Sequence, residues 1–276
     1  MFGVRKLEAS TFVTEVVPWL SAREVENNVM IGIAQRLARA PETAPGAVLA
    51  AVEAHGALVG AVICTPPHFA IVTALPAGAA GHIASFFREL GFTPDGAYGP
   101  ADHGRNVACA FAEALGRRAE KGSDEILYEL VAVRAPARPA GGARLATEDD
   151  LPLLTRLIGE FFAELGLPHP PDATTLAERR VASGSALLWE DGEVRALACE
   201  ARRMTTGAAI APVYTVPSAR GRGYGSAVTA ELCQRLLDDG CRFVCLHAER
   251  KNPTSNRIYQ AIGFRTAGTF NSWIVR

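Results

Sequence analysis

The stretch Arg220-Gly221-Arg222-Gly223-Tyr224-Gly225 decides how the C-terminal half of this chain folds. The apolar run at 208–216 predicts a strand before it, and residues 223–239 predict a helix that ends at Gly240. A helix N-terminus offers unpaired backbone N–H groups and a partial positive charge. Glycines let the backbone approach a phosphate without Cβ clashes, and arginines add charge-assisted hydrogen bonds. The loop therefore predicts a site for a di-anion such as a pyrophosphate.

Two common nucleotide-binding motifs do not fit this loop. The Walker motif requires Lys and then Ser or Thr after its last glycine, whereas Gly225 is followed by Ser226 and Ala227. The dinucleotide fingerprint requires G-x-G-x-x-G, whereas the glycines here follow G-x-G-x-G with Arg222 between the first two. Taken alone, the loop also fits a plain glycine-rich turn.

A second motif, Asn252-Pro253-Thr254-Ser255-Asn256-Arg257-Ile258-Tyr259, lies further along the chain and is followed by Gly263-Phe264. The pattern R-x-x-G-x-G on a strand-to-helix turn, then N-P-x-S-N-x-x-Y and G-F, resembles the GNAT superfamily of N-acetyltransferases. The likeness covers residues 144–276. It implies an α/β (α+β) fold of two tandem GNAT-like domains. Each domain would be a mixed, mostly antiparallel twisted sheet flanked by helices.

The resemblance also implies a cofactor, acetyl-CoA, and direct transfer of its acetyl group to an amine. The pantetheine arm would pair like an extra strand with residues 213–216, and the loop backbone would hold the pyrophosphate. Tyr259 matches the tyrosine that protonates the departing thiolate, a task that suits a phenol. The implied cofactor-binding residues are Val213, Tyr214, Thr215, Val216, Arg220, Gly221, Arg222, Gly223, Tyr224, Gly225, Ser226, Asn252, Asn256 and Tyr259.

The two motifs do not identify the general base that takes a proton from the amine. An ammonium group cannot attack a thioester, so a base or a proton-relaying water is needed. The strand at 208–216 carries no acidic residue, which makes Glu200 on the neighbouring strand the first candidate beside Tyr259 as a catalytic residue. Weaker candidates are Glu160, Glu249 and His247.

Strands and helices can be predicted along the whole of the second half, residues 144–276. Thr147 followed by Asp150 fits a helix N-cap with an acid three residues on, and the pattern at 190–192 indicates a hairpin turn. The expected strands lie at 144–147, 187–189, 194–200, 208–216, 242–248 and 264–275, and the expected helices at 151–165, 176–183, 223–239 and 255–262.

The first half has a similar rhythm, and residues 135–143, rich in Pro and Gly, are predicted to be a linker. Its expected strands lie at 48–54, 57–64, 69–75 and 125–133, with helices at 83–90 and 106–118. Where the cradle would stand, the sequence is Pro76-Ala77-Gly78-Ala79-Ala80-Gly81, without an arginine. We therefore expect a degenerate GNAT-like domain at 1–134, which does not bind the cofactor, and a catalytic domain at 144–276.

Composition excludes several classes of protein. Hydrophobic residues make up 49% of the chain, enough for real cores, and the net charge of −1 argues against binding nucleic acid through bulk positive charge. Residues 54–87 carry no Asp, Glu, Lys or Arg, but three prolines favour two buried strands and a loop over a membrane span. The six cysteines show no zinc or disulfide pattern and suggest buried thiols in the cytoplasm.

Three functions fit these observations. The first is an acetyl-CoA-dependent N-acetyltransferase, a monomer or homodimer that acts on a small-molecule amine without nucleic-acid or membrane partners. The second is a module that binds acyl-CoA as a sensor without turnover. The third is transfer of a longer acyl group, or transfer to a hydroxyl group.

Overall fold

A computed structural model describes residues 2–167 and 169–276. Contacts divide the chain into two compact units that are not continuous in sequence. Unit 1 runs to Leu127 and adds His247–Lys251 and Ala267–Arg276, and unit 2 comprises Tyr128–Leu246 and Asn252–Thr266. The sequence predicts two domains that fold independently, at 1–134 and 144–276, with a linker at 135–143. The division by contacts does not test independent folding, so these boundaries stay a prediction.

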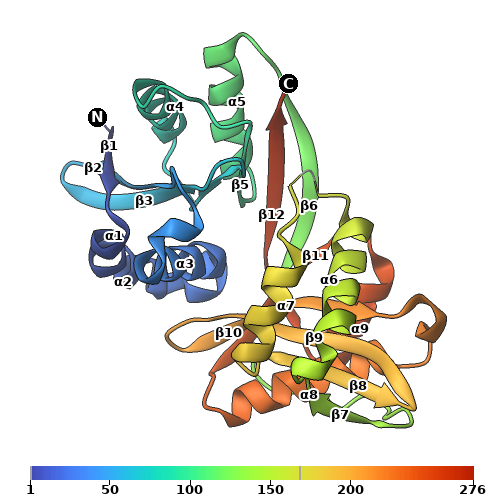
Figure 1. Ribbon diagram of the computed structural model, residues 1–276. Coiled ribbons are helices and arrows are strands. Elements are labelled where there is room, and N and C mark those ends of the chain that lie inside the picture. Colours follow the sequence, from blue (N-terminus) through green and yellow to red (C-terminus); the bar gives the residue numbers. More distant parts are fainter. Residues whose placement is uncertain (1, 168) are drawn as a thin grey trace. The chain divides into compact units, whose positions relative to one another are not determined.

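Unit 1 is a sheet of strands covered by helices (Figure 1). Strands β1 to β4 are antiparallel neighbours, β4 and β5 are parallel, and β12 is antiparallel to β5. The strands are β1 (Phe2–Leu7), β2 (Val48–Ala54), β3 (Ala57–Cys64), β4 (Ala70–Val72), β5 (Gly96–Pro100), β6 (Ala119–Leu130) and β12 (Arg265–Val275), of which β6 and β12 also give residues to unit 2. The helices are α1 (Ala9–Glu15), α2 (Val17–Leu20), α3 (Glu24–Arg39), α4 (Ala79–Glu89) and α5 (His103–Leu115).

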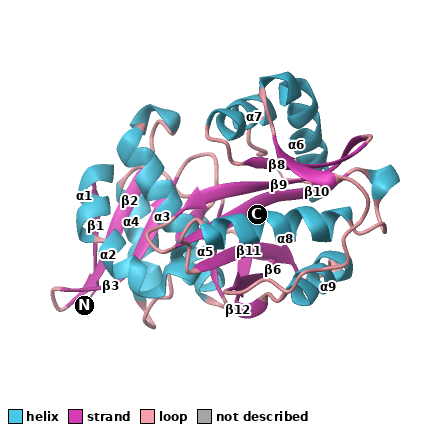
Figure 2. Cartoon of the chain, turned by 90° about the horizontal axis from the view of Figure 1, so that it is seen from below, coloured by secondary structure: helices cyan, strands magenta, loops and turns pink. Residues whose placement is uncertain are grey.

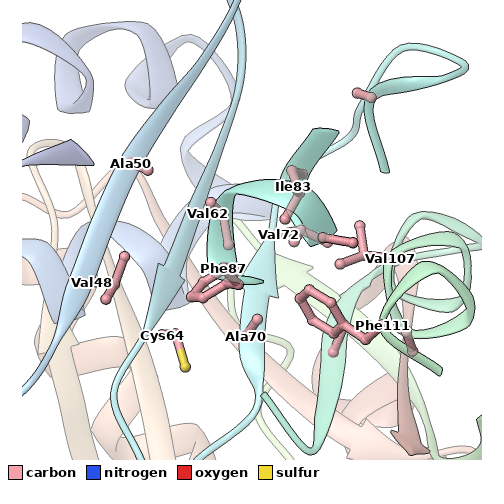
Figure 3. Packing of buried hydrophobic residues seen from close by; sticks show 14 of the residues in the cluster. Val48, Ala50, Val62, Cys64, Ala70, Val72, Ile83, Phe87, Val107 and Phe111 are labelled. Carbon is pink, nitrogen blue, oxygen red and sulfur yellow. The ribbon is translucent and has the colours of Figure 1, made fainter. Parts of the chain in front are cut away.

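Both faces of β2 and β3 are buried, so unit 1 has a layer of helices on each side. Alternate residues of β2 point to α4 and α5, because successive side chains of a strand leave opposite faces. Figure 3 shows Val48, Val62, Phe87 and Phe111 in this core. Helices α1 to α3 lie on the other side of the strands (Figure 1). The two uncharged strands expected within 54–87 are therefore core strands, and no helix of the described residues is long and apolar enough to span a bilayer.

Unit 2 has the same plan. Strands β7, β8, β9 and β10 are antiparallel neighbours, and β10 is parallel to β11. Its strands are β7 (Gly142–Leu145), β8 (Ala186–Asp191), β9 (Glu193–Arg203), β10 (Gly207–Thr215) and β11 (Phe243–Glu249), and its helices are α6 (Leu151–Leu165), α7 (Ala173–Ala182), α8 (Tyr224–Asp238) and α9 (Pro253–Ile262). Residues 247–249 of β11 belong to unit 1.

The sheet of unit 2 lies between α6 and α7 on one face and α8 on the other (Figure 2). Leu157 of α6, Ala177 of α7 and Leu197 of β9 are fully buried in the first of these layers, together with Tyr214 of β10. The helix after the cradle thus packs on the opposite face of the sheet from the Tyr214 ring.

Local sequence signals predicted the second half well. The N-cap signal is confirmed, since Thr147 and Asp150 form a capping box, although a 3-10 turn occupies Glu148–Asp150 before α6 begins. The chain leaves α6 and α9 through Gly166 and Gly263, both in the left-handed region. In the first half, the prediction missed β1, α1 to α3 and β5, and placed the strand before the linker at 125–133 instead of 119–130.

Asp150 is expected to make stability depend on acid pH. Arg144 Nη1 and Nη2 donate to its carboxylate at 2.7 and 2.8 Å, and with the Thr147 N–H they hold the pKa of Asp150 at about 2, below 3.8. A pKa lower in the folded state stabilises the fold above about pH 4, and this contribution is lost as pH falls toward 2. We expect Asp150→Asn to lower the free energy of unfolding by about 1–2 kcal/mol at pH 7 and by clearly less at pH 3.

Urea unfolding at the two pH values measures this difference. Asp149→Asn is the matched control, because Asp149 is the exposed neighbour in the same turn. A loss of stability for Asp150→Asn that is the same at both pH values would contradict the assignment.

Candidate active site

Among the described residues of unit 2, the edge of β10 beyond residue 209 pairs with no strand on one side. Among the described residues, β10 and β11 pair at three positions, from Gly207 with Phe243 to Ala209 with Cys245. Past that point β10 continues to Thr215, with its other edge paired to β9. Backbone N–H and C=O groups on an unpaired edge can bind an extended chain as an added strand. The predicted arm-binding residues Val213, Tyr214 and Thr215 lie on this part of β10.

A bulge interrupts β10 just before these residues. Ile210 pairs with Glu200 and Val213 with Ala198, so Ala211 and Pro212 lie opposite a single residue of β9. A bulge bends the strand and re-aims its polar groups, and bulges are frequent beside active sites. The regular pairing of β10 with β9 is therefore interrupted at residues 211–213.

The predicted cradle lies between β10 and α8. After a 3-10 turn at Pro217–Ala219, Gly221 and Gly223 take φ values of +75° and +87°, which favour glycine. Helix α8 then begins at Tyr224, and no side chain caps its N-terminus. The first backbone N–H groups of α8, including those of Gly225 and Ser226, have no acceptor within the helix and remain available to an anion.

Gly225 is required by close packing. A Cβ atom at this position would lie 2.7 Å from Thr215 Oγ1. The first turn of α8 therefore lies against the Thr215 side chain at the end of β10, and a side chain at position 225 would force one of the two to shift.

Together these features fit the pantetheine and pyrophosphate parts of coenzyme A. The open edge of β10 suits an extended arm with amide groups, and the uncapped N-terminus of α8 suits two phosphates. Val216 follows β10 with both backbone groups bonded, since its N–H donates to Arg195 O at 3.0 Å and its C=O accepts from the Ala219 N–H at 2.8 Å, so its predicted contact with the arm stays a prediction. The fit rests on backbone, which explains why the loop needs glycine at several positions.

The two arginines of the loop have partners in the protein. Arg220 Nη2 donates to Glu164 Oε1 at 2.6 Å, its Nε donates to Thr215 O at 3.1 Å, and the guanidinium lies 5.4 Å from the centre of the Tyr214 ring. Arg222 lies 5.3 Å from the centre of the Tyr224 ring. Their predicted contacts to phosphate remain a prediction, and Arg220 would have to exchange Glu164 for the phosphate.

Tyr214 connects β10 to α6. Its hydroxyl has two carboxylate acceptors within hydrogen-bond distance for its single proton, Glu160 Oε2 at 3.1 Å and Glu164 Oε1 at 3.2 Å. Burial, and next the hydrogen bond to Glu160, raise the pKa of Tyr214 to about 12. Tyr214 therefore stays a hydrogen-bond donor at physiological pH. The sequence did not single out Glu164, because a partner so distant along the chain leaves no local signal.

Tyr259 lies in the interior of unit 2. It is 8% exposed, and its ring centre lies 6.1 Å from that of Tyr128 and 5.7 Å from that of Phe264. Burial raises the pKa of Tyr259 well above its usual value, against a weaker opposite effect of a hydrogen bond with Ser255. The phenol therefore keeps its proton, as a proton donor to a thiolate must.

The two asparagines of the second motif have structural contacts. Asn252 Oδ1 accepts from the Ser255 N–H at 3.1 Å and caps α9, whose first residue is Pro253. Asn followed by Pro is a strong start for a helix, so part of this motif encodes a helix N-terminus. Asn256 Oδ1 accepts from the Tyr128 hydroxyl at 3.1 Å. Whether either lines a cofactor arm stays a prediction.

Glu200, the predicted base, is held by a neighbour on the same strand. Arg203 Nε and Nη2 donate to its two carboxylate oxygens at 2.7 and 2.9 Å. Both carboxylate oxygens of Glu200 are therefore engaged by one guanidinium group. The position of Glu200 opposite the bulge suits a catalytic role, whereas its pairing disfavours one.

The comparisons with known proteins agree with this geometry. Residues 151–264 match the model of the acetyltransferase (GNAT) family. No curated protein matches the sequence. Among solved structures, a GCN5-related N-acetyltransferase from Sphaerobacter thermophilus is 16% identical with a TM-score of 0.65, covering 99% of this chain and 94% of that one.

Two further structures are similar over nearly their whole length. An acetyltransferase of the GNAT family from Colwellia psychrerythraea is 14% identical with a TM-score of 0.59, covering 99% of both chains. A tandem GNAT protein from the clavulanic acid biosynthesis pathway is 14% identical with a TM-score of 0.56, covering 99% of this chain and 98% of that one. At such identities the likeness concerns the fold, and it confirms the predicted fold class of two GNAT-like domains.

Proposed function

We propose that this protein transfers an acetyl group from acetyl-CoA to an amine of a small-molecule acceptor, because residues 151–264 match the model of the acetyltransferase (GNAT) family. The observation that supports this most strongly is the junction of β10 and α8, where an open strand edge meets an uncapped helix N-terminus. Tyr259 lies on α9, which packs against α8 in the same unit. The same fold supports acyl transfer in general, and the acetyl donor and the amine are the proposed details.

Each group of residues would have a separate role in the proposed acetyl transfer. Coenzyme A, bound as its acetyl thioester, supplies the acetyl group and leaves as a thiol. The edge of β10 from Val213 to Thr215 would pair with the arm, and the backbone from Arg220 to Ser226 would bind the pyrophosphate. A backbone N–H at Val213 or Tyr214, beside the bulge, stabilises the negative charge that develops on the carbonyl oxygen. The neutral amine attacks the carbonyl carbon and the carbon–sulfur bond breaks. Tyr259 would donate its proton to the departing sulfur, and the proton lost by the amine, relayed through a base or a water, would restore the phenol.

Unit 1 is proposed to be a degenerate partner that does not bind the cofactor. Its α4 begins after Gly78, in the place of the cradle, but Phe2 lies over this turn. A Cβ atom on Gly78 would lie 3.6 Å from Phe2 Cε2, and the Phe2 ring centre is 5.5 Å from that of His82. The segment 76–81 carries no arginine. An apolar ring over the helix N-terminus disfavours a bound phosphate.

An acceptor-panel assay tests the proposed function. We expect release of free thiol from acetyl-CoA with at least one amine, and isothermal titration with coenzyme A should give one site per chain. Two sites per chain would contradict the degenerate assignment of unit 1. Binding of coenzyme A without turnover of any amine or hydroxyl compound would replace the enzyme with an acyl-CoA sensor.

The Glu200→Gln variant tests the predicted base. Because Arg203 binds both carboxylate oxygens, we expect kcat at pH 8 to fall less than about 10-fold, below the roughly 100-fold that loss of a general base costs. A loss of 100-fold or more, with an altered pH–rate profile, would restore Glu200 as the base. Stopped-flow or steady-state thiol release across pH 6–9 measures kcat at pH 8 and the pH–rate profile.

We further propose that the enzyme works in the cytoplasm, as a monomer or homodimer. Cys109 is an exposed free thiol, and the buried cysteines outside any disulfide are Cys64, Cys199, Cys233, Cys241 and Cys245. An exposed free thiol suits a reducing compartment.

A further inference from the structure

Arg220 of the predicted cradle forms an ion pair with Glu164 of α6. Its Nη2 donates to Glu164 Oε1 at 2.6 Å, and its Nε donates to Thr215 O at 3.1 Å. The side chains of Arg220 and Glu164 are 47% and 50% exposed, so the pair lies at the surface of unit 2. An exposed ion pair contributes little to stability. Arg220 can therefore change its acidic partner without any movement of the buried core.

A second carboxylate lies beside Glu164. Glu160, one turn earlier in α6, and Glu164 are both within hydrogen-bond distance of the Tyr214 hydroxyl, which has one proton to donate. Arg156 Nη1 donates to Glu160 Oε1 at 2.6 Å, so Glu160 has an arginine of its own. Two carboxylates at this spacing on a helix repel each other. If Arg220 left Glu164, this repulsion would favour its return.

The ion pair lies at the start of the loop that is proposed to bind pyrophosphate. Arg220 directly precedes Gly221, and α8 begins at Tyr224 with no side chain that caps it. A pyrophosphate bound by the backbone of this loop would compete with Glu164 for the guanidinium group. It carries more negative charge than one carboxylate and offers several acceptor oxygens, so it would win this competition while it is bound.

We propose that Glu164 competes with coenzyme A for Arg220 and so speeds the release of coenzyme A after acetyl transfer. This inference rests on the proposed function and gives a role in the reaction cycle to a residue outside the bond changes. Arg220 would pass from Glu164 to the pyrophosphate when the cofactor binds, and back to Glu164 when it leaves. Product release limits turnover in many enzymes. A competing group at the site then favours turnover over tight binding.

Isothermal titration and stopped-flow dissociation with coenzyme A test this proposal. We expect Glu164→Gln to lower the Kd for coenzyme A by about 3- to 10-fold, mostly through slower dissociation. Glu160→Gln is the matched control, because it removes the same charge one turn away from a residue that is bound to Arg156 and Tyr214. This control should change the Kd by less than about twofold.

A double-mutant cycle links the effect to Arg220. Arg220→Gln alone should weaken the binding of coenzyme A, because it removes a charge-assisted hydrogen bond to the phosphates. In that background, Glu164→Gln should leave the Kd unchanged, since no guanidinium group remains to compete for. Equal tightening in both backgrounds would overturn the proposal, because it would show a general effect of negative charge near the site.

Thermal unfolding gives a second readout that is independent of turnover. Without ligand, Glu164→Gln should melt close to the wild type, because an exposed ion pair contributes little to stability. The same concentration of coenzyme A should then raise the melting temperature of the variant more than that of the wild type, as tighter binding requires.

An unchanged Kd in Glu164→Gln, or a lower Kd that arises from faster association alone, would overturn the role of Glu164 in release and leave acetyl transfer standing. Failure of the wild type to bind coenzyme A would instead defeat the proposed function, and the inference with it.

Discussion

The Tyr259→Phe variant is expected to lose about 100-fold or more in kcat while its Kd for coenzyme A changes by less than about threefold. The hydroxyl is the sole atom removed, and the ring that packs against Tyr128 and Phe264 remains. Because burial raises the pKa of this phenol, it keeps its proton across the working pH range. The pH–rate profile of the wild type should therefore show no basic limb from Tyr259 below about pH 10.

Tyr128→Phe is the matched control for this prediction. Tyr128 is also a buried tyrosine of unit 2, but its hydroxyl is bound to Asn256 and Gln260. We expect this variant to keep kcat within about threefold of the wild type. If Tyr259→Phe turned over as fast as the wild type, Tyr259 would have no part in the leaving-group step.

The Gly225→Val variant is expected to weaken coenzyme A binding by at least 100-fold. A Cβ atom would lie 2.7 Å from Thr215 Oγ1, and Thr is β-branched with few rotamers that clear the space. The first turn of α8 would move away from β10, which separates the two backbone segments proposed to bind the arm and the pyrophosphate. Isothermal titration with coenzyme A measures the loss, and circular dichroism reports whether α8 and the rest of the fold remain.

Unit 1 offers the matched control. Gly81 lies in the first turn of α4, and a Cβ atom there meets nothing within 4 Å. Gly81→Val makes the same chemical change at the corresponding helix and should leave the Kd for coenzyme A unchanged. An equal loss from both variants would show that the effect of Gly225→Val is a general destabilisation rather than damage to the cradle.

The sequence predicted those parts of the fold that are encoded locally. The capping box at Thr147 and Asp150 and the left-handed glycines at 166 and 263 mark helix ends, and the structure places them there. The strand β5 was missed because five residues with two glycines carry little pattern. The pairing of Phe270 with Pro100 joins positions far apart in the chain, which one sequence does not reveal.

The candidate site shows the same limit. The glycine loop and Tyr259 stood out because a motif marks them, and their proposed roles wait for the experiments above. Glu164 was not singled out, because its importance lies in what surrounds it in space. It contacts Arg220 and Tyr214 from another element.

The strand β12 affects the order in which the protein can fold as it is made. Residues 270–274 form the neighbour of β5, and the backbones of Arg276 and Arg118 exchange hydrogen bonds of 2.8 and 2.9 Å. Chains usually fold from the N-terminus while synthesis continues. Here the edge of β5 stays open until the ribosome has released residues translated after nearly all of unit 2. For that interval a nascent chain needs protection of an exposed strand edge, which is the kind of surface that chaperones bind and that aggregates recruit.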